Sequence, residues 1–213
     1  KSNMDGRLYR QEMEASFETT GNRAAYNFDR DVNVRKAEGL TSERFIGMDM
    51  NVDYMSAVIA CVYTDGTIHY YDEIRQSNSN TEAMSREMRK RWGLHPIFPD
   101  PAGKARSTTS NRSDHQILKD NGFHVIARVA HPTQKDRLSA LNRMLLDAKD
   151  RVKMTIDPSC IYLIKDLEQV QRDKKGGIDK SNPELSHMLD ACSYYIEYKH
   201  PIVQRVGTSI SWN

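Results

Sequence analysis

The sequence lacks a long apolar run. No stretch of about 18 apolar residues occurs among its 213 residues, and the N-terminal residues 1–6 are not the apolar segment of a signal peptide. We therefore expect a soluble, intracellular protein. The sequence also lacks a large excess of either charge, because 31 Lys and Arg against 29 Asp and Glu leave a net charge of +2. Binding to nucleic acid would then depend on local basic patches and not on a global field. The length fits one domain.

Cysteine is rare as well. The three residues, Cys61, Cys160 and Cys192, are widely spaced and lie in apolar segments. An odd number at such spacing fits neither a disulfide framework nor a zinc site. We expect three reduced thiols in the core.

Phosphate-binding loops are missing from the sequence. No Gly-x-x-x-x-Gly-Lys-Ser/Thr motif occurs, which excludes a P-loop ATPase within these residues. Gly47-Met48-Asp49 matches the first strand of an actin-like or hexokinase-like ATPase, but the two further Gly-rich loops of that class are not visible. This alternative is weak.

Three regions differ in pattern. Residues 1–42 show helical spacing only at Leu8, Met13 and Phe17 before Gly21 and Gly39 interrupt it, so we interpret them as a connecting segment that packs on a larger partner or on the domain surface. Residues 43–200 have regular strand and helix patterns. Residues 201–213 form a tail without a pattern that we can interpret.

The regular region opens with three strand-like runs, at 44–50, 56–63 and 67–74. Asp65-Gly66 lies between the second and third runs and predicts a hairpin with a type I′ turn. Helices and short strands then alternate. Helices are predicted at 81–92, after Ser113, from Thr133 to Ala148 and from Ser159 to Val170. A last helix is predicted to begin after Asn182 as N-cap, with Pro183 as its first residue. Strands are predicted at 97–100, 124–130 and 152–156.

Three carboxylates occupy unusual places in this pattern. Asp49 lies in a predicted inner strand, Asp100 ends the next short strand, and Asp190 lies on the last helix. A buried carboxylate costs several kcal/mol unless a cation or hydrogen bonds compensate. The three could therefore converge on divalent metal ions, for which carboxylate oxygens are suitable ligands.

Each carboxylate also has a structural interpretation. Asp49 could pair with a buried Arg or Lys, and Asp100 could simply start the turn before Pro101 without binding a metal. Asp190 could be an exposed helix residue, since it lies off the apolar stripe. His187 could orient a ligand or DNA, although a solvated histidine is the simpler interpretation. Asp53 is a possible extra acidic contact and more simply a loop residue.

The predicted order is an antiparallel three-stranded meander followed by strand–helix units, with acids on the first strand, the fourth strand and the last helix. This order predicts an α/β fold with a ribonuclease H-like mixed central sheet flanked by helices. The motifs 45–51, 98–103 and 187–191 resemble the nuclease domain of the large terminase subunit of tailed, headful-packaging bacteriophages. The resemblance covers roughly residues 8–198, and residues 9–17 resemble the family's link to its ATPase domain. The chain thus resembles an excised domain that lacks an N-terminal ATPase.

The resemblance implies a metal-dependent endodeoxyribonuclease that cuts concatemeric double-stranded DNA during viral genome packaging, in the cytoplasm of the infected host cell. Asp49, Asp100 and Asp190 would be both the catalytic and the metal-binding residues, holding two Mg²⁺ or Mn²⁺ ions, with Asp49 bridging them. The implied partners are DNA, the missing ATPase domain, the portal protein and the small terminase subunit. No membrane and no further cofactor are implied.

DNA contacts are expected from basic residues near these acids. Lys104 and Arg106 follow Asp100 in a loop rich in hydroxyl groups, and Lys174, Lys175 and Lys180 form a second patch beside Gly176-Gly177. The basic residues between Arg86 and Arg91 are more simply the outer face of a helix. Two other functions stay open at this point: a Holliday-junction-resolvase-like nuclease, and a non-catalytic docking or assembly module.

Overall fold

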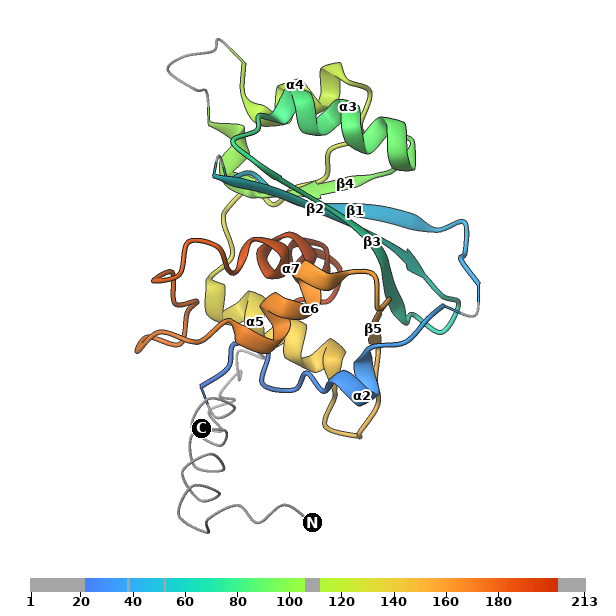
Figure 1. Cartoon of the computed structure of the whole chain (residues 1–213), viewed down its shortest axis with the longest axis vertical. Coiled ribbons are helices and arrows are strands. Elements are labelled where there is room, and N and C mark those ends of the chain that lie inside the picture. Colours follow the sequence, from blue (N-terminus) through green and yellow to red (C-terminus); the bar gives the residue numbers. More distant parts are fainter. Residues whose placement is uncertain (1–21, 38, 52, 106–111, 203–213) are drawn as a thin grey trace, which may run out of the picture.

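A computed structural model describes residues 22–37, 39–51, 53–105 and 112–202 (Figure 1). One five-stranded sheet has the order β4-β1-β2-β3-β5. Antiparallel pairing joins β1 to β2 and β2 to β3, whereas β4 and β5 run parallel to their neighbours β1 and β3. The strands are β1 (Arg44–Asp49), β2 (Tyr54–Val62), β3 (Ile68–Ser77), β4 (Ile97–Pro99) and β5 (Met154–Ile156). The predicted meander and the predicted mixed sheet are confirmed.

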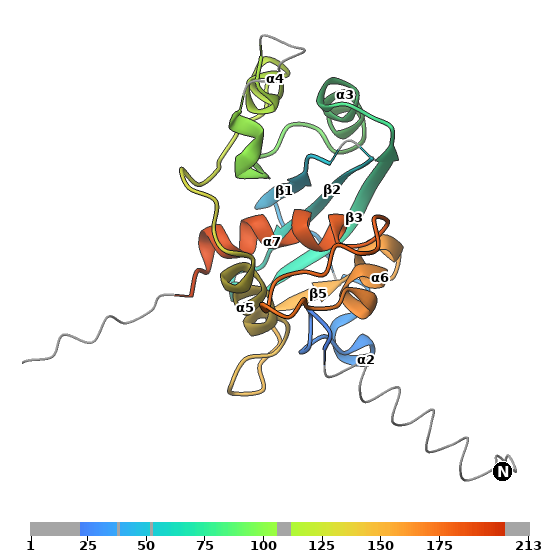
Figure 2. The same ribbon diagram turned by 90° about the vertical axis from the view of Figure 1, so that its left-hand side faces the viewer.

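Helices cover both faces of the sheet (Figures 1 and 2). One face carries α3 (Thr81–Trp92) and α4 (Asp114–Asp120). The other carries α5 (Gln134–Leu145), α6 (Ile161–Gln169) and α7 (His187–Lys199), with the short α2 (Arg30–Asn33) beside β5. A 3-10 turn, η1 (Pro101–Lys104), follows β4. No helix in the described part of the chain is both long and apolar enough to cross a membrane.

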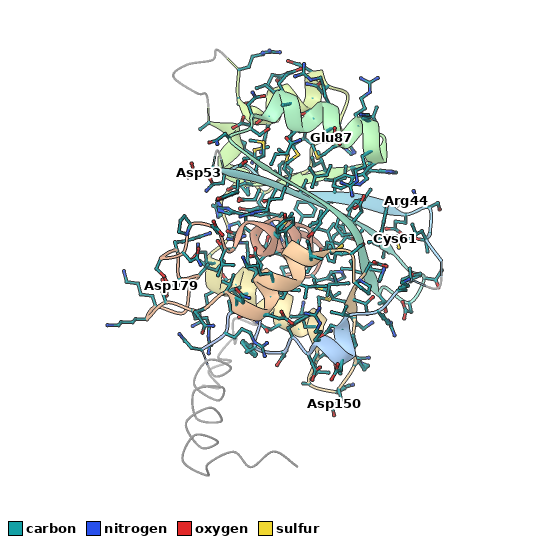
Figure 3. All side chains as sticks on the ribbon, viewed as in Figure 1. Arg44, Asp53, Cys61, Glu87, Asp150 and Asp179 are labelled. Carbon is teal, nitrogen blue, oxygen red and sulfur yellow. The ribbon has the colours of Figure 1, made fainter. Side chains whose placement is uncertain are left out.

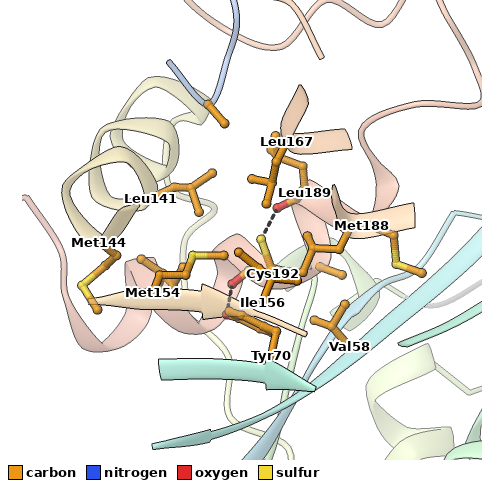
Figure 4. Close-up of a cluster of buried hydrophobic side chains, with 14 of the residues drawn as sticks. Val58, Tyr70, Leu141, Met144, Met154, Ile156, Leu167, Met188, Leu189 and Cys192 are labelled. Atoms are coloured by element: carbon orange, nitrogen blue, oxygen red, sulfur yellow. Dashed lines mark hydrogen bonds between the residues drawn. The ribbon is translucent and has the colours of Figure 1, made fainter. Parts of the chain in front are cut away.

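The alternating side chains of β1 divide the core into two clusters. Phe45 packs in the cluster on the side of α5, α6 and α7, whereas Ile46 and Met48 belong to the cluster under α3 and α4. In the first cluster, the Tyr70 hydroxyl donates to the Cys192 carbonyl at 2.9 Å (Figure 4). All three cysteines are buried and free, as expected.

The N-terminal region contributes to the same core. Ala24, Ala25 and Phe28 are buried in the cluster beneath the sheet, and the Ala24 amide donates to the Val170 carbonyl. Leu8, Met13 and Phe17, which have helical spacing in the sequence, lie outside the described residues. The proposed division at residues 42 and 200 stays a prediction.

The predicted hairpin at Asp65-Gly66 is present, but its turn type differs from the prediction. Gly66 has φ +80°, whereas Asp65 is not among the described residues with positive φ, so a type I′ turn is wrong. The Tyr63 amide bonds to the Thr67 carbonyl across a three-residue loop, an arrangement typical of a type I turn that ends in a left-handed residue. Asp65 accepts from the amide and the hydroxyl of Thr67, which favours this three-residue loop.

A second correction concerns the predicted strand at 124–130. Only Val125 forms a bridge, with Ile97 at the sheet edge, after which the chain leaves the sheet. Arg128 pulls this segment toward α7, where its Nε lies 3.1 Å from a Glu197 carboxylate oxygen. The tertiary ion pair replaces further strand pairing.

The starts of the last two helices also differ from the predictions. The helix expected after Ser159 begins at Ile161, and the helix expected at Asn182 begins at His187. Asn182 instead accepts from the Glu184 amide in a local turn, and Ser186 takes a left-handed conformation with φ 80°. The predicted caps Ser113 and Thr133 are confirmed at α4 and α5.

Candidate active site

Asp49, Asp100 and Asp190 line one pocket of about 260 Å³. The parallel strands β1 and β4 pair Met48 with Pro99, so the next residue on each, Asp49 and Asp100, emerges at the same edge of the sheet. The Asp100 amide also donates to the Met48 carbonyl at 3.0 Å. The register of these two strands therefore brings the first two carboxylates together.

Asp190 joins them because α7 packs very closely on β1. A Cβ atom on Gly47 would lie 2.2 Å from the Ala191 carbonyl oxygen, a distance that no side chain could occupy. Gly47, Asp49 and Phe45 share one face of β1 by the alternation of the strand. The glycine of the Gly-x-Asp motif thus admits the helix that carries the third carboxylate.

Asp49 is 7% exposed and contacts His187, whose Nδ1 lies 3.0 Å from its Oδ2. The other ring nitrogen of His187 lies 2.9 Å from the Pro183 carbonyl, which can only accept, so Nε2 carries a proton. Burial raises the pKa of Asp49, the His187 hydrogen bond opposes this, and the charge of Asp190 adds to it. Burial lowers the pKa of His187, but its hydrogen bonds with Asp49 and the Pro183 carbonyl, together with the charge of Asp49, leave the pKa raised.

These contacts correct two sequence interpretations. The partner of Asp49 is a histidine and not a buried Arg or Lys. His187 is 5% exposed, so its interpretation as a solvated helix residue is wrong. Its position at the first turn of α7 and its contact with Asp49 make it a residue that orients the carboxylate.

Asp100 has both roles that its sequence position allowed. Its Oδ1 accepts from the Ala102 amide at 2.8 Å and so caps η1, as a turn-forming Asp before proline does. The same oxygen lies 3.0 Å from Nε2 of His131. The carboxylate nevertheless faces the pocket that Asp49 and Asp190 line.

Asp190 is 4% exposed, so its interpretation as a surface residue is wrong. Its Oδ1 lies 2.8 Å from Nη2 of Arg137, and its Oδ2 lies 2.6 Å from Nζ of Lys180. Burial lowers the pKa of the Arg137 guanidinium, but Asp190, with smaller contributions from Tyr194 and Asp100, leaves the pKa raised. Two cations therefore compensate this buried acid.

The donor set fits a hard divalent cation. Three carboxylates provide the oxygen ligands that Mg²⁺ and Mn²⁺ prefer, in a pocket that is partly open to solvent. Within the described ranges, no three His, Cys, Asp or Glu side chains are grouped closely enough to hold an ion as they stand. Each carboxylate instead contacts a cationic or histidine side chain.

The other predicted site residues are dispersed. Lys104 donates to the Arg128 carbonyl, and Lys174 and Lys175 lie in an exposed turn and do not line the pocket. Arg106 lies outside the described residues. Asp53 is exposed in the loop beyond β1 and does not line the pocket (Figure 3). Lys180 is the one residue of the two predicted basic patches that lines the pocket among those described.

Sequence reasoning missed four pocket residues: His131, Gln134, Arg137 and Tyr194. A signal existed for Arg137, which shares the apolar stripe of α5 with Leu138, Leu141 and Leu145 and is 2% exposed. A charged residue on a buried stripe indicates a buried partner. No comparable signal marks the other three.

Comparisons with solved structures find the same fold in phage proteins. The nuclease domain of the P22 large terminase aligns with a TM-score of 0.62 at 15% identity, over 83% of this chain and 93% of that one. The large terminase nuclease domain of bacteriophage SPP1, solved with bound Mn, gives 0.55 and 15%, over 78% and 97%. The large terminase of a thermophilic bacteriophage gives 0.61 and 15%, over 82% of this chain.

The chain spans 44% of the thermophilic phage's large terminase, and so corresponds to part of that protein. No curated protein matches the sequence. One protein-family model, described as the terminase RNaseH-like domain, matches residues 46–199, which include Asp49, Asp100 and Asp190. The match extends over most of the sequence and confirms the resemblance seen in its motifs, so the chain belongs to the terminase RNase H-like domain family.

Proposed function

We propose that the chain is the metal-dependent DNA endonuclease domain of a viral genome-packaging terminase large subunit, and that it cuts double-stranded DNA with little sequence specificity. The observation that carries the proposal is the convergence of Asp49, Asp100 and Asp190 in one pocket of a chain from this family. The large terminase nuclease domain of bacteriophage SPP1 was solved with bound Mn, which supports a divalent cation in this chain.

The three aspartates would hold two Mg²⁺ or Mn²⁺ ions. Such ions would supply Lewis-acid chemistry, which would activate a water and stabilise the leaving 3′ oxygen of a phosphodiester. Asp49 would bridge them because the inner strand β1 fixes its backbone on both sides. Asp100 would complete one site and Asp190 the other.

The surrounding residues keep these carboxylates in position. His187 anchors its Nε2 on the Pro183 carbonyl and presents Nδ1 to Asp49, which fixes the orientation of that carboxylate. The Ala102 amide and His131 restrain Asp100 in the same way. Such restraints reduce the reorganisation that ligand binding requires.

DNA would approach the open side of the pocket. Lys180 lies at this rim with half of its side chain exposed, and Lys174 and Lys175 extend the same loop. Their charges suit phosphates without reading bases. The family resemblance supports the rest of the proposal. The substrate would be concatemeric DNA, and the partners would be the ATPase domain, the portal protein and the small terminase subunit. The reaction would take place in the cytoplasm of the infected cell.

Plasmid cleavage tests the proposal. The chain should cut supercoiled plasmid with Mg²⁺ or Mn²⁺ but not in excess EDTA, and Ca²⁺ should bind without supporting cleavage because its looser coordination misplaces the attacking water. Asp49→Asn should abolish cutting. Asp53→Asn is the matched control, since Asp53 is exposed outside the pocket, and it should cut normally. Cleavage that persists in EDTA, or in Asp49→Asn, would contradict the metal mechanism.

A further inference from the structure

Two cations of different character contact Asp190. Arg137 is buried, with 3% of its side chain exposed, whereas the side chain of Lys180 is 49% exposed. Each takes one carboxylate oxygen: Arg137 takes Oδ1 and Lys180 takes Oδ2. Both oxygens of the carboxylate are therefore already in contact with a cation.

Arg137 is fixed in place by α7 itself. Its Nη1 donates to the Ser193 hydroxyl at 2.9 Å, and its guanidinium lies 4.7 Å from the centre of the Tyr194 ring. Moving this buried charge away from Asp190 would leave an uncompensated charge in the interior, at a high cost in free energy. Oδ1 of Asp190 therefore stays with Arg137.

Lys180 can leave. It belongs to the segment between α6 and α7, and its long side chain can turn its ammonium into solvent at little cost. Besides Asp190, its Nζ contacts the Ser186 hydroxyl at 2.7 Å. That second contact holds the ammonium over Oδ2.

We propose that Lys180 competes with a divalent cation for Oδ2 of Asp190. Both are positively charged and approach the same oxygen, so at contact distance they repel each other. The ammonium compensates the buried carboxylate in the metal-free protein and must withdraw when the ion binds. This inference rests on the proposed metal site.

Mn²⁺ titration calorimetry of the whole chain, at fixed pH and ionic strength, tests the competition. Lys180→Met removes the ammonium, so the Mn²⁺ dissociation constant should fall by about two- to fivefold, the effect of deleting one partly exposed ion pair. The Mn²⁺-induced rise in melting temperature should increase in parallel, since tighter binding to the native state adds stability.

A charge-neutral variant separates contact from background charge. Ser186→Ala keeps the net charge but removes the hydroxyl that holds Lys180, and should also tighten Mn²⁺ binding, though less than Lys180→Met. Lys149→Met removes an exposed lysine outside the pocket and should leave binding unchanged.

The failures are distinguishable. Mn²⁺ binding by the unaltered chain that Lys180→Met leaves unchanged or weakens would overturn the competition and leave the nuclease proposal intact. If Mn²⁺ binding tightens in Lys180→Met but not in Ser186→Ala, Lys180 acts only through its general positive charge. That result would also overturn the competition. No Mn²⁺ binding by any of these proteins would overturn the proposed metal site, and the competition with it.

Discussion

The three aspartates have the same chemistry but different surroundings at the scale of the residue. Asp49 contacts a histidine, Asp100 contacts a backbone amide and a histidine, and Asp190 contacts two cations. Mutual repulsion in a metal-free site, considered alone, predicts that neutralising any of them leaves stability unchanged or slightly higher. The ion pairs of Asp190 reverse the expected sign at that position.

Asp190→Asn should lower the free energy of unfolding by about 3–5 kcal/mol, because it leaves the buried Arg137 guanidinium without its counter-charge. Asp49→Asn should be neutral or slightly stabilising at pH 8, because burial already disfavours the charged form of Asp49. Urea unfolding in EDTA measures both, and the exposed Asp53→Asn serves as the unchanged control. An Asp190→Asn protein as stable as the parent would show that the buried pair contributes nothing.

At the scale of the element, two helices take their N-terminal caps from distant carboxylates. Glu73 on β3 accepts from the Tyr162 and Leu163 amides at the start of α6, and Asp166 on α6 accepts from the Met188 and Leu189 amides at the start of α7. Carboxylates satisfy the free amides of a first turn and interact well with the helix dipole. The Glu73 and Asp166 caps determine where α6 and α7 begin. The cap of α7 therefore determines where His187 and Asp190 lie.

The Glu73 cap should make stability depend on pH. Burial raises its pKa from 4.5 to about 7, against the two amide bonds that lower it. A raised folded-state pKa means that the native state holds the proton more tightly, so the contribution is fully present below pH 4.5 and is lost as pH rises through 7.

Glu73→Gln removes this titration. The difference in unfolding free energy, variant minus parent, should therefore rise by about 2–3 kcal/mol between pH 5 and pH 8. The variant should start about 1 kcal/mol less stable at pH 5, since the amide side chain has only one acceptor for two N–H groups. Urea unfolding at the two pH values measures the difference. Parallel pH profiles would contradict a titrating Glu73.

The close contact between β1 and α7 gives a second prediction for an element. Gly47→Ala should cost about 1–3 kcal/mol of stability or more, because its Cβ would meet the backbone oxygen of Ala191 and push α7 away. Cleavage should fall with it, since α7 carries Asp190. Gly39→Ala is the matched control, because nothing lies within 4 Å of a Cβ at that position. Equal effects of the two substitutions on melting temperature and plasmid cleavage would rule out the close approach as their cause.

At the scale of the whole molecule, the small net charge of +2 means that the proposed DNA binding would depend on a few basic residues near the pocket. We expect binding to be weak, sequence-tolerant and salt-sensitive, with the logarithm of the association constant falling linearly as the logarithm of salt concentration rises. Fluorescence anisotropy with unrelated duplexes at several salt concentrations measures this dependence. Cleavage confined to one short sequence at every salt concentration would contradict it.

The sequence by itself determined the meander, the order of the elements and the three acids, because hydrophobic period and turn chemistry are local properties of the chain. Gly47-Met48-Asp49 and Asp100-Pro101 are each recognisable as motifs from a few neighbouring residues. The caps at Ser113 and Thr133 were predictable for the same reason, since their partners lie three residues away.

Only the tertiary structure decided the rest, because the partners lie far apart in the chain. The starts of α6 and α7 depend on Glu73 and Asp166, about 90 and 20 residues away from the amides that they cap. Asp190 is buried because Arg137 compensates it across 53 residues, and no local pattern of either helix contains that pairing. Local chemistry supplied the groups of the site, and long-range packing and charge compensation determined which of them meet.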